Sequence, residues 1–283
     1  MKDGSRDERE KDDEIELPAS IEAAWGIRER PRKGPKPGLS LPRIVEAAIR
    51  VAERDGLASV SMGRVAAELG ASTMSLYRYV SAKDELLMLM ADAVYGAPPS
   101  LRGPDDGWRE GLAKWAWGSL ERMRRHPWVL RIPISGPPIT PNQIAWLEAG
   151  LQCLQETGLT EAEKMSVILL ISGYVRNDAS IASDIDAAAR AAGKELPEFM
   201  PAFARILRRV TDPERFPALT AVLATDLFDV DDDPDDEFRF GLERILDGIE
   251  KLVRTRLETP GPVSARGRSV TTSGQSGDTE SAR

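Results

Sequence analysis

A tight turn at residues 70–72, Gly-Ala-Ser, separates two short segments with helical periodicity, and this arrangement limits the fold more than any other stretch of the sequence. The first segment begins at Ser61 and places Val65 and Leu69 on one face, while the second segment turns Leu76 inward. Two short helices joined by a glycine-containing turn form a helix-turn-helix. The second helix of such a unit can lie in the major groove of DNA.

The predicted second helix, residues 73–79, keeps a polar outer surface once Leu76 faces the core. Hydroxyl groups and a methionine at the start of a helix suit base edges and thymine methyl groups, whereas tyrosine and lysine side chains can reach phosphates. The candidate DNA-contacting residues on or beside this helix are Thr73, Met74, Ser75, Tyr77, Arg78, Tyr79 and Lys83. Ordinary helix–helix packing of the tyrosines is the alternative. The caps, the glycine turn and the Leu-Tyr-Arg-Tyr-Val run together favour DNA contact.

Helix signals dominate the rest of the sequence and strand signals are scarce, so we predict an all-α fold. Ser40 can cap a helix that ends near Gly56, residues 81–84 form a capping box that opens another helix, and Thr160 with Glu163 forms a second box. No apolar run approaches the ~18 residues of a membrane span. The charged N-terminus lacks the apolar region of a secretion signal. These features predict a cytoplasmic protein without a membrane partner.

Cysteine and histidine each occur once, as Cys153 and His126. A single cysteine excludes an internal disulfide framework and fits a reducing compartment. A single histidine argues against a histidine-rich metal site and a Ser-His-Asp triad, and no P-loop, GxSxG or HExxH motif supports catalysis. We therefore expect neither an enzyme nor a cofactor. The alternative is a helical small-molecule-binding protein, or an enzyme, in which the helix-turn-helix is incidental.

An acidic run at residues 229–237 has the odd-numbered spacing of a calcium-binding loop. Pro234 replaces the glycine that such a loop needs, and Phe240 stands where the bidentate glutamate belongs. We therefore interpret the run as a solvated loop that precedes a helix, and we expect no metal site.

Charge and composition divide the chain into four regions. The net charge of −8 argues against DNA binding by the whole molecule, and residues 39–96 carry six Lys or Arg against seven Asp or Glu. Residues 28–37 instead carry five cations and one acid. We predict a disordered N-terminal extension with this basic arm over residues 1–38, a helix-turn-helix domain over 39–96, a regulatory domain over 97–258 and a disordered tail over 259–283.

The cations of the basic arm are Arg28, Arg30, Arg32, Lys33 and Lys36. Because phosphate neutralisation supplies much of the affinity for DNA, we predict that they follow the phosphate backbone or enter the minor groove, as homeodomain arms do. A solvated linker is the alternative.

Residues 39–95 resemble the DNA-binding domain of the TetR family of bacterial transcriptional repressors, through the stretch IVEAAIRVAERDGLASVSMGRVAAELGASTMSLYRYVSAKDELL. The resemblance implies a homodimer that binds palindromic double-stranded operator DNA and is released by a small-molecule effector. It implies phosphate contacts from Ser61, Tyr77, Tyr79 and Lys83, and base contacts from Thr73, Met74 and Ser75. Gly63 stands where the tetracycline repressor has a base-reading arginine, so the operator sequence should differ. Arg64, beside it, is a further candidate DNA-contacting residue.

Residues 124–160 and 238–252 resemble, more weakly, the regulatory domain of the tetracycline-repressor branch. A tryptophan-rich helix at residues 105–125 and the loop at 127–138 are the predicted walls of an effector pocket, and plain core packing is the alternative. The candidate ligand-binding residues are Trp115, Trp146, Tyr174 and Asn177. Because the tetracycline repressor holds its ligand partly through histidine, we expect an apolar or aromatic effector here rather than tetracycline and magnesium.

A seven-residue repeat in residues 236–253 predicts a dimer interface. Two glycines on the repeating face favour a close approach of two backbones, since a glycine inside a helix otherwise costs about 1 kcal/mol relative to alanine. The predicted interface residues are Phe238, Gly241, Leu242, Ile245, Gly248, Ile249 and Leu252. We expect this helix and residues 163–182 to pack with the same helices of a second copy into a four-helix interface. Packing within one chain is the alternative.

Overall fold

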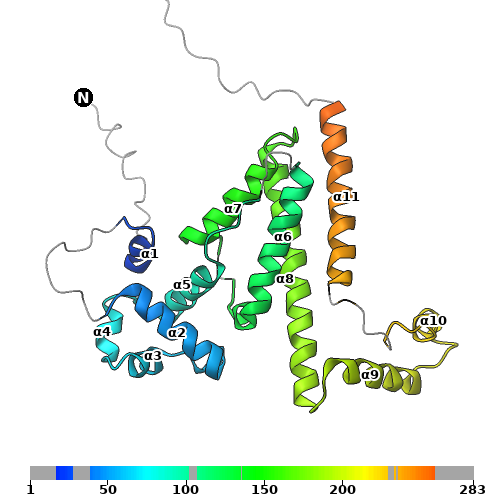
Figure 1. Cartoon of the computed structure of the whole chain (residues 1–283), viewed down its shortest axis with the longest axis horizontal. Helices are drawn as coiled ribbons and strands as arrows, with labels where there is room; N and C mark the ends of the chain where they lie inside the picture. Colours follow the sequence, from blue (N-terminus) through cyan, green and yellow to red (C-terminus); the bar gives the residue numbers. More distant parts are fainter. Residues whose placement is uncertain are drawn as a thin grey trace, which may run out of the picture.

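The structure, a computed structural model, describes residues 17–27, 39–101, 107–134, 136–228, 233 and 235–258. Every regular element in these residues is a helix, which confirms the predicted all-α fold. Figure 1 shows a small group of helices, α1 to α5, beside a larger group in which the long helices α6, α8 and α11 lie side by side. Helices α9 and α10 extend away from one end of α8.

The elements of the smaller group are α1 (Ala19–Ala24), α2 (Leu41–Asp55), the 3-10 helix η1 (Leu57–Ser59), α3 (Met62–Glu68), α4 (Thr73–Tyr77) and α5 (Lys83–Tyr95). The elements of the larger group are α6 (Trp108–Arg125), the 3-10 helix η2 (Pro127–Arg131), α7 (Pro141–Cys153), α8 (Glu161–Ala191), α9 (Leu196–Val210), α10 (Pro217–Leu223) and α11 (Asp236–Glu258).

Helices α2 to α5 close on one apolar core. Ile44 and Val51 of α2, Val65 of α3, Leu76 of α4 and Leu86 of α5 are all fully buried. Burying an aliphatic side chain of this size stabilises a fold by about 1.5–3 kcal/mol. This core therefore fixes the angle between α3 and α4, which is the geometry of a helix-turn-helix.

Local signals set the ends of α3 and α4 as the sequence predicts. The side-chain oxygen of Ser61 accepts the backbone N–H of Arg64, and that of Ser72 accepts the backbone N–H of Ser75. Gly70 lies between the two helices with φ of 62°, a conformation that side chains with a Cβ rarely adopt. The predicted caps and glycine turn are therefore confirmed.

The capping box predicted at residues 81–84 is wrong. Helix α5 begins after Ala82, which makes no side-chain cap bond, and the backbone N–H and hydroxyl of Ser81 instead donate to the carboxylate of Glu85 one turn later. Ser40 precedes α2 in an extended conformation, also without a side-chain cap bond.

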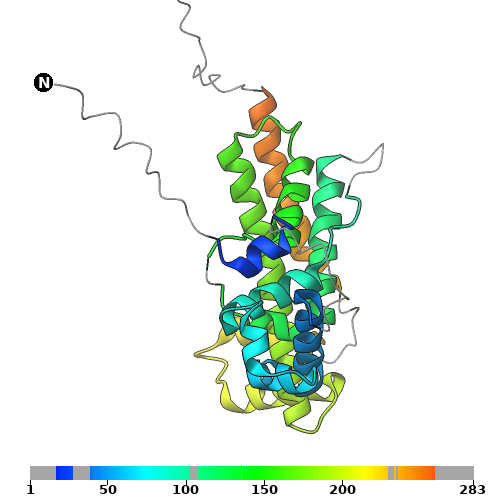
Figure 2. The ribbon, with the colours of Figure 1, turned by 90° about the vertical axis from the view of Figure 1, so that its left-hand side faces the viewer.

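Residues 17–27 belong to the predicted disordered extension over residues 1–38, and for these residues the prediction is wrong. They include α1, which lies against α5 (Figure 2), with Ile21 fully buried. The hydroxyl of Ser20 donates to Glu85 of α5 at 2.7 Å. On its other side, the indole N–H of Trp25 donates to the carbonyl of Ile139, just before α7, at 2.8 Å. The segment therefore contacts both groups of helices.

The larger group packs α6, α7 and α8 around buried aromatic and aliphatic side chains, with α11 alongside. The predicted capping box of Thr160 and Glu163 at the start of α8 is confirmed. Arg256, near the end of α11, also pairs with Glu163, so one carboxylate joins the ends of two long helices. Among the described residues, no helix has both the length and the apolar character needed to cross a bilayer.

Helix α5 is attached to the larger group near its C-terminal end. The buried carboxylate of Asp92 accepts the backbone N–H groups of Asn142 and Gln143, at 2.9 and 3.1 Å, in the first turn of α7. Arg122 of α6 donates to the carbonyl of Tyr95, and the indole of Trp146 donates to that of Gly96. The two groups are therefore joined by a polar junction as well as by the chain.

Candidate nucleic-acid interface and effector cavity

Helix α4 presents the outward ridge that the sequence predicts. Leu76 is fully buried, whereas Met74 is 75% exposed and Tyr77 is 46% exposed. Arg78, directly after the helix, is exposed, and Thr73 is half-buried at its first position. A short helix anchored by one buried leucine, with its other side chains clear of the protein, can enter a major groove.

The serines at this surface are bonded locally. The side-chain oxygens of Ser72 and Ser75 lie 2.7 Å apart and share a hydrogen bond, while Ser61 is exposed at the start of α3. Lys83 is exposed in the first turn of α5. A hydroxyl at a helix start and an exposed lysine are both groups that contact phosphates.

Tyr79 differs from the prediction. It is half-buried, and its hydroxyl donates to the backbone carbonyl of Leu39 at 3.1 Å. A phosphate oxygen accepts hydrogen bonds but donates none, so it needs a proton that Tyr79 already gives to Leu39. In this arrangement Tyr79 holds the chain that enters α2. A phosphate contact would require its hydroxyl to leave Leu39, and that contact stays a prediction.

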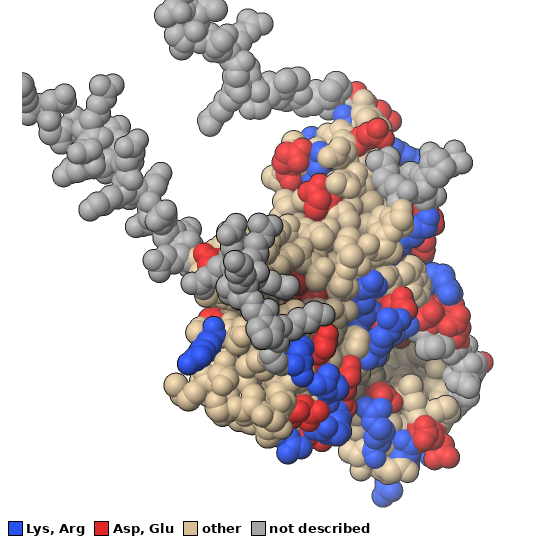
Figure 3. Space-filling view, turned by 60° about the vertical axis from the view of Figure 1, so that its left-hand side comes forward, with Lys and Arg blue, Asp and Glu red and all other residues tan. Residues whose placement is uncertain are grey.

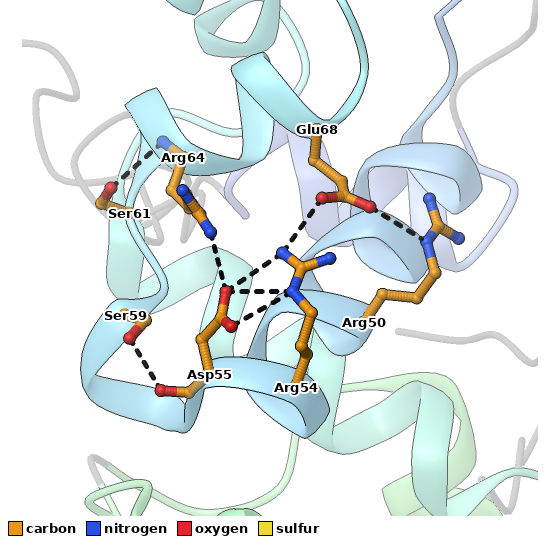
Figure 4. A network of polar contacts seen from close by, with 7 residues as sticks. All are labelled: Arg50, Arg54, Asp55, Ser59, Ser61, Arg64 and Glu68. Atoms are coloured by element: carbon orange, nitrogen blue, oxygen red, sulfur yellow. Dashed lines mark hydrogen bonds and ion pairs between the residues drawn. The ribbon is translucent and has the colours of Figure 1, made fainter.

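Arg64 belongs to an ion network between α2 and α3 (Figure 4). Its guanidinium lies 2.9 Å from the carboxylate of Asp55. The guanidinium of Arg54 lies 3.0 Å from the same carboxylate. Arg54 reaches Glu68 at 3.2 Å, and Glu68 lies 3.6 Å from Arg50. Hydrogen bonds from Arg54 and then Arg64 lower the pKa of Asp55. Two acids thus offset most of the charge of three arginines beside the predicted DNA-contacting surface.

Charges of both signs are interspersed on the face shown in Figure 3, which has no single basic patch. The predicted basic arm, Arg28, Arg30, Arg32, Lys33 and Lys36, lies outside the described residues.

A surface cavity of about 500 Å³ lies beside α6. Trp117, Gly118 and Lys114 form one wall, and Asp235 lies on another side. Trp117 packs edge to face on Phe238 of α11, with ring centroids 4.6 Å apart. The site therefore combines an aromatic surface with charged groups at its edge, a combination typical of small-molecule sites.

A second cavity, an apolar groove of about 380 Å³, runs between α8 and α11. Val167 and Leu170 of α8 line it together with Ile245, Gly248 and Leu252 of α11. Three further apolar side chains of α8 are exposed: Met165, Leu169 and Ile181.

Comparison with known proteins identifies the family. The family model for bacterial regulatory proteins of the tetR family matches residues 44–89, and the model for the tetracyclin repressor-like C-terminal domain matches residues 99–253. The HTH-type transcriptional repressor DrrR1 of Streptomyces coeruleorubidus is 42% identical over 243 residues, covering 85% of this chain and 88% of that protein. The chain belongs to the TetR family. It is accordingly a ligand-responsive, DNA-binding transcriptional repressor.

Solved TetR-family structures share the fold. Apo ActR of Streptomyces coelicolor aligns with a TM-score of 0.62 at 25% identity, covering 78% of this chain and 99% of that one. ActR in complex with actinorhodin aligns with a TM-score of 0.64 at 26% identity, covering 76% and 98%.

The four residues predicted to bind a TetR-family effector lie in separate environments. Trp115 and Trp146 are buried with ring centroids 6.2 Å apart, and the indole of Trp115 donates to the carbonyl of Trp146 at 2.8 Å. Tyr174 stacks on Phe238 and donates to its carbonyl at 3.0 Å, and Asn177 is exposed. The two tryptophans are buried and their N–H groups are satisfied, which favours the packing alternative, and their contact with an effector stays a prediction.

The predicted TetR-family dimer face is only partly available. Phe238, Leu242 and Ile249 are buried within the chain. At Gly241, a Cβ would collide with the hydroxyl of Tyr174, so this glycine allows contact with α8 of the same chain. Packing within one chain accounts for these four positions, and the dimer face stays a prediction. Ile245, Gly248 and Leu252, together with the buried Ile249, line the groove between α8 and α11.

Sequence reasoning did not identify Trp117 and Asp55 as functional candidates. Trp117 lies at the cavity because α11 packs Phe238 against its ring, and no local sequence signal distinguishes it from the other tryptophans of α6. Asp55 is the last residue of α2, where the helix dipole favours a cation and disfavours a carboxylate. An acid at this position is a sequence signal that the side chain has a specific partner.

Proposed function

We propose that this TetR-family chain binds a palindromic operator as a homodimer through α4. The observation that carries the proposal is the ridge of Met74, Tyr77 and Arg78, exposed around the fully buried Leu76. Two such helices related by a two-fold axis read half-sites about 34 Å apart, one turn of B-DNA. Ser61 and Lys83 supply phosphate contacts that position the helices without reading sequence.

The homodimer forms through the faces of α8 and α11 that the chain itself leaves open. Leu169 and Leu170 are largely exposed, at 74% and 53%, and lie on the helix that borders the apolar groove with Ile245 and Leu252. Exposed apolar patches of this kind mark protein interaction sites. A two-fold axis would place each groove against the helices of the second copy.

The operator is found by selecting duplexes from a random library with the purified chain. The selected sequences should be inverted repeats, and Met74→Ala should weaken binding to them about fivefold, because an apolar base contact is expected at the lower end of the ~1–3 kcal/mol that good base contacts contribute. Ile134→Ala is the control, since Ile134 is exposed to a similar degree on the larger group of helices. Binding without any sequence preference would contradict the proposal.

The dimer face is tested by Leu169→Glu, with Ile134→Glu as its match because both side chains are 74% exposed. Light scattering should show a dimer for the wild type and for Ile134→Glu, and a monomer for Leu169→Glu. A dimer in all three samples would place the interface elsewhere.

The effector occupies the cavity beside Trp117, where a planar aromatic compound can stack on the indole. The Trp117–Phe238 and Phe238–Tyr174 ring pairs extend this aromatic surface inward from the cavity towards α8. In the solved complexes, ActR binds actinorhodin and (S)-DNPA.

A panel of planar aromatic compounds should quench tryptophan fluorescence and release the operator. Trp117→Leu should lose both effects, whereas Trp25→Phe should keep them, because Trp25 lies on α1 and not at the cavity. Release that persists in Trp117→Leu would place the effector elsewhere.

A further inference from the structure

Asp55 and Arg64 occupy helix ends that disfavour their charges. Asp55 is the last residue of α2, where the helix dipole presents negative charge, and Arg64 lies in the first turn of α3, where it presents positive charge. Both side chains are partly exposed, at 28% and 53%. An exposed ion pair adds little to stability. Helix stability therefore does not explain why this pair is present.

The pair is nevertheless held firmly (Figure 4). Asp55 accepts two bonds from Arg54, through Nε and Nη2, and one from Arg64. The hydroxyl of Ser59 donates to the backbone carbonyl of Asp55 at 2.8 Å, which fixes the end of α2. Glu68 holds the other side of Arg54. The carboxylate of Asp55 is thus oriented by groups on α2 and α3, and Ser59 of η1 holds its backbone carbonyl.

In this network, half of the cations of the DNA-binding domain form ion pairs with acids of the same chain. Residues 39–96 contain six cations, and three of them, Arg50, Arg54 and Arg64, pair with Asp55 or Glu68. Arg64 is the one whose backbone N–H is bound by Ser61, at the start of α3. It is therefore the network arginine nearest in sequence to a predicted phosphate contact.

We propose that Asp55 is a specificity-determining residue, which holds the guanidinium of Arg64 against the end of α2 and so keeps it from binding phosphates of any duplex. This rests on the proposed contact of α3 and α4 with DNA. Contacts to phosphate add affinity for every sequence alike, whereas base contacts distinguish the operator. On the operator, base contacts fix how α3 and α4 dock, whereas on another duplex the protein can shift until a freed guanidinium meets a phosphate. Withholding this cation therefore lowers non-specific affinity more than operator affinity.

The test compares Asp55→Asn with Glu46→Gln, which removes the same charge from an exposed position on the same helix. Dissociation constants are measured for the selected operator and for a scrambled duplex of equal composition, from about 50 to 200 mM salt. In Asp55→Asn, affinity for the scrambled duplex should rise about three- to fivefold, with a salt slope steeper by about one ion. The ratio of operator to scrambled affinity should fall at least twofold, while Glu46→Gln should leave it unchanged.

Arg64→Gln separates positioning from simple charge repulsion. In the Arg64→Gln background, Asp55→Asn should no longer raise affinity for the scrambled duplex. The proposal is overturned if Asp55→Asn still raises affinity for the scrambled duplex in the Arg64→Gln background. It is also overturned if Asp55→Asn alone raises affinity for both duplexes equally, or if Glu46→Gln lowers the specificity ratio as Asp55→Asn does.

Arg64→Lys provides an independent variant should Asp55→Asn fail to fold. Lysine lacks the forked guanidinium, so Asp55 holds it less well. The ratio of operator to scrambled affinity should therefore also fall in Arg64→Lys. An unchanged ratio would overturn the proposal. A wild-type chain that selects no operator would instead refute the proposed DNA contact, which is a distinct outcome.

Discussion

Asp92 joins the DNA-binding helices to the regulatory helices, and its removal should cost the fold about 2–4 kcal/mol. The carboxylate is 6% exposed and accepts two backbone N–H groups of α7, from Asn142 and Gln143, plus the side-chain amide of Asn142 at 2.9 Å. Hydrogen bonds to a charged group contribute about 1.5–3 kcal/mol each. Because water can reach the partly exposed end of α7, Asp92→Ala should lose less than the sum of the three.

The measurement is urea unfolding of the full chain at fixed concentration, followed by circular dichroism. In a thermal unfolding experiment, the same loss of about 2–4 kcal/mol would lower the melting temperature of a fold of this size by about 5–15 °C. Glu148→Ala is the control, because it removes an exposed carboxylate of α7 that accepts from Gln152, and it should change stability by less than about 0.5 kcal/mol. A loss below about 1 kcal/mol in Asp92→Ala would refute the assigned role.

Three further perturbations follow from single contacts. The hydrogen bond from an arginine of α11, followed by the backbone N–H of Thr160, lowers the pKa of Glu163 to about 2. Its contribution to the free energy of unfolding is therefore present above about pH 4.5 and lost as the pH falls towards 2. In Glu163→Gln, the free energy of unfolding should depend less on pH in this window. Gly241→Ala should lower stability by about 1–3 kcal/mol in urea unfolding, because its methyl group would displace the ring of Tyr174. Ile21→Asp should detach α1, seen as faster amide exchange in residues 19–24, since an unpaired charge cannot stay buried.

The helix-turn-helix could be predicted because its signals are local. Ser61, Gly70 and Ser72 each act within one turn, and Leu76 fixes the facing of α4 by period alone. Helix α1 could not be predicted in this way. It is six residues long, and the burial of Ile21 depends on α5, more than sixty residues away in the sequence.

The regulatory half shows where periodicity stops being informative. Helix α11 has an apolar face towards α8 and further apolar residues at the groove, so a seven-residue repeat does not say which face meets a second copy. Phe238 fits the repeat and is buried in the chain, whereas Gly248 fits the repeat and is open. Likewise, tryptophan content does not distinguish a pocket wall from the core. That distinction depends on where each indole N–H finds its partner, as Trp115 does in the chain.

The junction at the end of α5 connects the cavity proposed for the effector to the DNA-binding helices. Gly118 lines the cavity, and its carbonyl accepts a bond from Arg122, one turn further along α6. The same guanidinium holds the carbonyls of Tyr95 and Ala97 and lies 4.8 Å over the ring of Trp146. A ligand that shifts this part of α6 must either carry the end of α5 with it or break these bonds. Since a ligand shifts an equilibrium only through contacts that differ between two states, Arg122 is where the difference in contacts would arise.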